Sequence, residues 1–120
     1  MLRFHVCIQG PEGGPLSVSF EEALPKLQSL PRMFLEPDGS FVWTGQIADT
    51  PWQIDGNLID QGPALAYVEL NGSCPAEQFD MLLASLGWPQ ASLEYQLPRR
   101  GVTLSEAEFR LQAGTIGADR

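Results

Sequence analysis

Residues 40–59 read SFVWTGQIADTPWQIDGNLI, and the spacing of their large and small residues decides the fold. Apolar and polar residues alternate on both sides of ADTP, which is typical of two half-buried strands joined by a turn. A two-residue Ala-Asp turn sets Trp52 opposite Gly45 and Phe41 opposite Gly56. Each ring then covers a position without a side chain, which shields a weak glycine site. The stretch therefore predicts an antiparallel hairpin with one apolar face.

The other strands can place their apolar residues on the same face, because side chains alternate across a strand. They are predicted in these runs: 2–9, RMFLE before the turn PDG, 64–70 and 91–97. A three-residue loop at 61–63 puts Ala66 on the apolar face and Leu65 on the opposite face. In the preceding hairpin, alternation places Ile47 on the apolar face as well. This agreement among the strands supports a single sheet.

A first helix is expected in SFEEALPKLQSL, where Ser19 and Glu22 form a capping box. Pro25 lies six residues into it and removes a backbone donor, so it should kink or split the helix. A second helix is expected in PAEQFDMLLASLG, with Pro75 at its first position and Cys74 as its cap.

The predicted order is β-α-β-β-β-β-α-β, which favours an α+β two-layer sandwich. Its sheet is mainly antiparallel, with about six strands, and two helices cover one face. The element order resembles the split βαβ arrangement of ferredoxin-like folds, widened by an extra hairpin. Residues 1–98 are expected to form a single domain, and 99–120 a C-terminal tail or docking arm. A short helix over about 105–113 is expected in this tail, where Ser105 and Glu108 form a capping box.

Charge and cysteine content narrow the class of protein. The chain carries 15 acidic and 7 basic residues, a net charge of −8. This balance argues against nucleic acid and against anionic membrane surfaces as partners. Two cysteines and the lack of a long apolar run predict a reduced, cytoplasmic setting.

The face opposite the apolar one is mixed, and a function that uses the sheet must use it. Six of its residues are candidates for a ligand or interaction face: Arg3, His5, Cys7, Asp55, Tyr67 and Glu69.

Two arrangements on the chain come close to known chemistry. His5 and Cys7 lie two residues apart on one strand, but zinc needs three or four ligands, so no metal and no cofactor is predicted. Cys74 precedes a helix, whose dipole would favour a reactive thiolate. Glu77 and Glu69 oppose that charge, and the chain has no C-x-x-C motif, so Cys74 is expected only to begin the helix.

The sequence contains no catalytic motif, so a role other than catalysis is favoured. We expect a small protein-interaction or ligand-binding module that pairs with a second copy of itself as a homodimer. The alternative is a small enzyme that uses His5, Cys7, Tyr67 and Glu69 on the open face.

Overall fold

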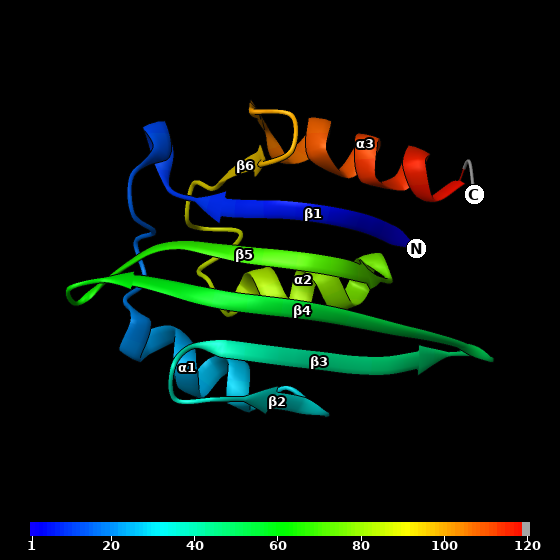
Figure 1. The fold of residues 1–120 in the computed structure, drawn as a ribbon, viewed down its shortest axis with the longest axis horizontal. Helices are drawn as coiled ribbons and strands as arrows, with labels where there is room; N and C mark the ends of the chain where they lie inside the picture. Colours follow the sequence, from blue (N-terminus) through cyan, green and yellow to red (C-terminus); the bar gives the residue numbers. More distant parts are fainter. Residues whose placement is uncertain (119–120) are drawn as a thin grey trace.

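The computed structural model describes residues 1–118, with side chains through Gly114, as one sheet with helices packed on one face (Figure 1). The strands of this part of the chain are β1 Leu2–Gln9, β2 Met33–Leu35, β3 Ser40–Ile47, β4 Thr50–Gln61, β5 Ala64–Cys74, β6 Glu94–Leu97 and β7 Val102–Leu104. They lie in the order β2-β3-β4-β5-β1-β6-β7, and every neighbouring pair is antiparallel. The predicted α+β class and antiparallel sheet are confirmed.

The described residues also form three helices: α1 Phe20–Gln28, α2 Ala76–Ala84 and α3 Glu106–Ala118. A short 3₁₀ turn, Pro11–Gly13, follows β1. The core is one cluster that joins the helices to a single face of the sheet. None of the helices in residues 1–118 has both the length and the apolar character that crossing a bilayer requires.

The β3–β4 hairpin has the predicted register, with Trp52 opposite Gly45. A Cβ atom at position 45 would lie 2.3 Å from Trp52 Cζ2, so the ring fills the space that a side chain would need. Trp43 packs edge-to-face on Trp52, with ring centroids 5.1 Å apart. Ile47, predicted to face the core, is instead 51% exposed, because it is the last residue of β3, at the tip of the hairpin.

The predicted loop at 61–63 is wrong, and so is the orientation of Leu65. The turn is one residue shorter, and the β4–β5 ladder shifts register between Ile59 and Asp60. This β-bulge leaves Ala66 without a partner on β4. Leu65 then pairs with Asp60, and its side chain faces the core. Leu65 is therefore fully buried in the core.

The prediction of about six strands is one too low, because the C-terminal segment adds β7. The short helix expected over about 105–113 is present as α3, and it is longer than predicted. β7 pairs with β6 and extends the sheet. The predicted Ser105–Glu108 capping box begins α3, with both of its hydrogen bonds present. Phe109 is fully buried and stacks on Tyr95, with ring centroids 5.1 Å apart. The expected tail thus contributes to the main core as far as Ala113, and its last two residues lie outside the described residues.

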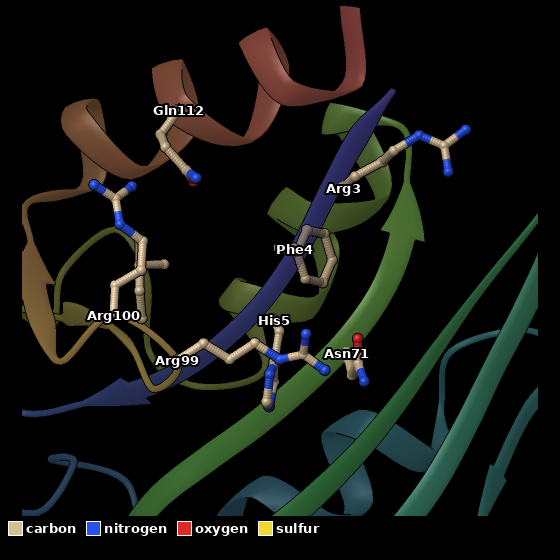
Figure 2. A pocket seen from close by; sticks show the side chains of 8 residues that line it. Arg3, Phe4, His5, Asn71, Arg99, Arg100 and Gln112 are labelled. Carbon is tan, nitrogen blue, oxygen red and sulfur yellow. The ribbon is translucent and has the colours of Figure 1, made fainter. Parts of the chain in front are cut away.

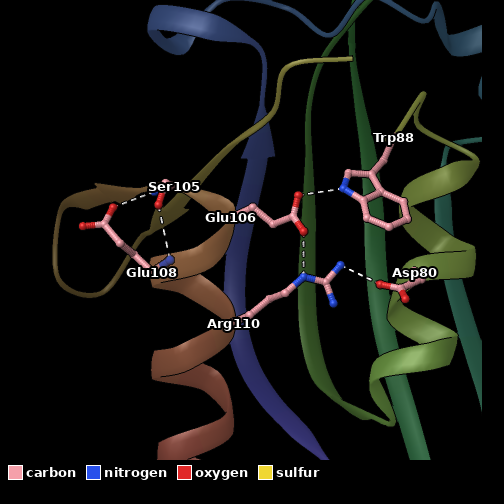
Figure 3. Close-up of polar contacts among 6 residues, drawn as sticks. All are labelled: Asp80, Trp88, Ser105, Glu106, Glu108 and Arg110. Atoms are coloured by element: carbon pink, nitrogen blue, oxygen red, sulfur yellow. Dashed lines mark hydrogen bonds and ion pairs between the residues drawn. The ribbon is translucent and has the colours of Figure 1, made fainter. Parts of the chain in front are cut away.

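A polar cluster around Arg110 joins α3 to α2 (Figure 3). The guanidinium donates from Nη2 to Asp80 Oδ1 at 2.6 Å and from Nε to Glu106 Oε2 at 3.0 Å. Trp88 Nε1 donates to the other oxygen of Glu106 at 2.7 Å. The guanidinium carbon also lies 5.4 Å from the ring centre of Phe79 and 5.5 Å from that of Trp88. These contacts hold α3 against α2 and against Trp88, which follows it.

The two helix prolines both differ from the predictions made for them. α1 continues through Pro25 as a single helix, because the carbonyl that loses its donor belongs to exposed Glu21 at the surface. At α2, Pro75 is itself the N-cap, with an extended backbone, and the helix begins one residue later. Cys74 is the last residue of β5 and does not cap the helix.

Candidate functional site

The six predicted face residues lie on the side of the sheet that the helices leave open. Asn71 lies opposite both His5 and Asp55, so these three residues form one row across three strands. Cys7 and Glu69 lie opposite each other in the next row. Arg3 and Tyr67 lie farther along the strands, in opposite directions from these rows, and both are exposed.

His5 and Glu69 form a hydrogen-bonded pair on this face. His5 Nε2 lies 2.8 Å from Glu69 Oε2, and both side chains are partly exposed. An ionised carboxylate can only accept, so the imidazole carries its proton on Nε2. The Nδ1 atom is buried and has no hydrogen-bond partner within the described residues. The contact thus fixes the orientation of the imidazole ring.

Cys7 is poorly placed for nucleophilic chemistry. It is 8% exposed, and burial raises the pKa of its thiol, with Glu69 opposite raising that pKa further. A nucleophilic cysteine needs the reverse, a pKa lowered by positive charge or by a helix N-terminus. The enzyme hypothesis therefore loses its strongest candidate nucleophile.

Cys74 has no access to solvent. Its exposed fraction is 0%, and burial raises the pKa of the thiol to about 12. The positive charges of the N-terminus and Arg110 lower this pKa by less than burial raises it. The site does not favour the thiolate that a reactive cysteine requires. Within the described residues, no group of three or more His, Cys, Asp and Glu side chains is placed to hold a metal ion.

A cavity of about 500 Å³ opens where β1 runs on past the end of β6 (Figure 2). β6 pairs with β1 only at Cys7–Gln9, because Pro98 follows and cannot donate to a ladder. The chain then turns sharply, and the amides of Arg100 and Gly101 both donate to the carbonyl of Leu97. Among the described residues, the first part of β1 thus has a strand neighbour on one side only, and α3 lies beyond the gap.

The cavity collects positive charge on a chain that is otherwise acidic. Arg3, Arg99 and Arg100 line it, three of the seven basic residues of the protein. None of the three forms an ion pair within the described residues, although the chain carries 15 acidic residues. Their guanidinium donors are therefore available to a ligand. His5, on β1, also lines the cavity.

The floor of the cavity is apolar. Phe4 and Leu97 line it, although they are only 9% and 6% exposed. An apolar floor with a few polar groups at its rim is the usual composition of a small-molecule site. The volume also lies within the range of about 300–1,000 Å³ that such sites occupy.

Sequence reasoning identified one wall of this cavity and missed the rest. Arg3 and His5 were candidates, whereas Arg99, Arg100 and Gln112 were assigned to a tail. The motif LPRRG was a usable signal, because proline and glycine flank two arginines where the last predicted strand ends. The motif indicates a turn, but it does not indicate what the turn faces.

Comparisons with protein-family models, curated proteins and solved structures find no match to this chain. Two features of the cavity bear on function: arginines that form no ion pair in the part of the chain that the structure describes, and an apolar floor.

Proposed function

We propose that the protein is a binding module for a small organic anion, held in the cavity between β1, the β6–β7 turn and α3. The observation that carries this proposal is a set of arginines around the cavity that form no ion pair with any described residue. A guanidinium offers a planar fork of donors that matches carboxylate and phosphate groups. The apolar floor would take the hydrocarbon part of the ligand.

The negative net charge favours anions that contact the arginines closely over anions that are held only weakly. At −8, the protein repels anions at long range, so a weakly held anion would not accumulate on its surface. Binding then depends on close contact with the guanidinium groups, where hydrogen bonds and local charge act together. Extended polyanions such as nucleic acid remain disfavoured, because they would also meet the acidic surface.

Calorimetric titration with small carboxylates and phosphates tests the proposal. The double variant R99Q/R100Q should bind at least about tenfold more weakly than the wild type, because hydrogen bonds to charged groups contribute about 1.5–3 kcal/mol each. The matched control is K26Q/R32Q, which removes the same charge from residues that do not line the cavity. This control should bind within about twofold of the wild type. Equal losses in both variants, or no binding by the wild type, would contradict the proposal.

Homodimer formation stays a prediction. The open face carries apolar residues on neighbouring strands, with Phe34 opposite Val42 and Ile59 opposite Tyr67. Asp55 lies opposite Val42 in the same row, so this acidic residue stands between the Phe34–Val42 pair and β5. Self-association through this face would therefore join two small apolar areas rather than one continuous patch. Sedimentation velocity over a range of concentrations tests it.

We also propose that the fold contains a ferredoxin-like unit, and that the protein occupies a reducing compartment. The spatial order β6-β1-β5-β4 supports the first part, because α2 connects two parallel strands, β5 and β6, that have β1 between them. On this interpretation, β2 and β3 widen one edge of the unit and β7 the other. Free, buried Cys7 and Cys74 support a reducing compartment.

A further inference from the structure

We infer that the anion bound in this cavity carries two charged groups joined by an apolar spacer. The inference rests on the proposed anion-binding function and specifies its ligand. Its basis is the direction of the two turn arginines (Figure 2). The side chain of Arg100 extends towards Gln112 of α3, whereas that of Arg99 extends towards His5 and Asn71.

The two arginines therefore define two separate polar ends of one cavity. Neighbouring residues in a tight turn could converge on a single anion, and a phosphate would then accept from both. Here they diverge, so one small anion cannot take both guanidinium groups in their observed positions. A ligand that uses both must carry an anionic group at each end.

Each end also has a neutral amide from a different element. Gln112 lies on α3 beside Arg100, and Asn71 lies on β5 near Arg99. A side-chain amide has two N–H donors, which complement the carboxylate or phosphate oxygens that a guanidinium leaves unpaired. Neither amide forms a side-chain hydrogen bond within the described residues, so both can turn their donors to a ligand.

The lining that the two polar ends share is apolar. Phe4 lies on β1 next to His5 (Figure 2), and Leu97 at the end of β6 lines the same cavity. A polar group over this floor would lose its hydration without gaining a partner, which costs free energy. A methylene chain or a ring would instead bury apolar surface there. The site thus favours a two-headed anion with a hydrocarbon centre.

The experiment compares dianions with matched monoanions on the full-length protein. Succinate, adipate, suberate and sebacate are titrated calorimetrically beside butyrate, hexanoate, octanoate and decanoate, which have the same carbon numbers. The α,ω-diphosphonates of the same lengths show whether the ends prefer carboxylate or phosphate chemistry. We expect an optimum length at which the dianion binds at least about tenfold more tightly than its matched monoanion.

Single variants assign the two ends. R99Q and R100Q should each lower the affinity for the best dianion to nearly that for its monoanion, while K26Q should leave it unchanged. Both arginines are exposed on a turn, so the variants should fold, and thermal melting of each confirms this. If monoanions bind as tightly as dianions and R99Q/R100Q abolishes both, the two-headed ligand is wrong but the anion site stands. If neither series nor inorganic phosphate binds, both proposals fail.

Discussion

The ring of Phe41 lies directly over Gly56, its partner on the neighbouring strand of the sheet. A Cβ atom at position 56 would come within 2.1 Å of Phe41 Cζ. The ring is 3% exposed and belongs to the core cluster, so it cannot move aside without disturbing its neighbours. Gly56 is thus required by packing, and its backbone is not in the left-handed region.

Replacing Gly56 with alanine should therefore destabilise the fold. The new methyl group forces the ring of Phe41 out of its position, and overpacking of this kind costs about 1–3 kcal/mol. Urea denaturation followed by tryptophan fluorescence measures the change in the free energy of unfolding. Trp43 and Trp52 pack in the same core and report on it directly.

Gly114→Ala is the matched control for this substitution. A Cβ atom there would lie 3.9 Å from Leu2 Cδ2, which is an ordinary contact, and the residue is inside α3. Alanine is the better helix former by about 1 kcal/mol, so the free energy of unfolding should stay level or rise slightly. Equal losses at positions 56 and 114 would show that the ring–glycine contact has no special effect.

The contrast between Gly56 and Leu65 shows what the sequence could predict. The position of Gly56 follows from alternation and a two-residue turn, both of which are local. Leu65 was assigned to the wrong face because a β-bulge shifts the ladder between Ile59 and Asp60. No residue in that stretch demands a bulge, yet the bulge leaves Leu65 fully buried in the core.

The cavity could not be predicted from the sequence, for a different reason. It exists because β1 is longer than β6 and because α3 packs beside the strand that extends past it. Pro98 indicates where β6 ends, but the length difference matters only once the strand order is known. Arg99 and Arg100 could be placed on a turn from sequence, whereas Gln112 on the opposite wall depends on how α3 docks.

Both thiols should be unreactive in the folded protein. Burial raises the pKa of Cys74 from 9.0 to about 12 and also raises the pKa of Cys7. At pH 8, the thiolate fraction of Cys74 is then about a thousandfold below that of an ordinary thiol, before its lack of access is counted. Labelling with a disulfide reagent at pH 8 should be negligible in buffer and rapid for two thiols in guanidinium chloride. Fast native labelling of Cys74 would restore the reactive-thiol hypothesis.

Cys74 should also make the fold sensitive to alkaline pH. Its pKa is raised in the folded state, so its contribution is complete below about pH 9, the unfolded value, and is lost as the pH rises towards 12. Three pKa units correspond to about 4 kcal/mol. Urea midpoints measured from pH 8 to 11 should fall steeply in the wild type and less steeply in C74A. Parallel curves for the two proteins would assign the alkaline loss to other groups.

Tyr95→Phe should stabilise the protein. The Tyr95 hydroxyl is buried and has no hydrogen-bond partner within the described residues, and burial raises its pKa. An unsatisfied buried polar group costs about 1–3 kcal/mol, whereas phenylalanine keeps the stacking on Phe109. The free energy of unfolding should rise by about 1–2 kcal/mol. Tyr67→Phe, at a site that is 38% exposed, is the control and should change it by less than about 0.5 kcal/mol. A loss of stability in Y95F would indicate that the hydroxyl has a partner in solution.

Arg110 is expected to hold α3 in place through packing as well as charge. Its ion pairs with Asp80 and Glu106 are partly exposed, and such pairs contribute about 1 kcal/mol or less each. The guanidinium also lies over Phe79 and Trp88, and cation–π contacts add about 0.5–1 kcal/mol each.

Arg110→Ala should therefore lower the free energy of unfolding by about 2–3 kcal/mol, and Arg110→Met, which keeps an apolar stem between the rings, by about half as much. Denaturation at low and high salt separates the two contributions, because salt screens the ion pairs and leaves the packing unchanged. Equal losses for the two variants would mean that charge alone holds the helix. Gln112 lies two residues along α3 and lines the cavity, so loosening this helix should also weaken anion binding at the Arg100 end.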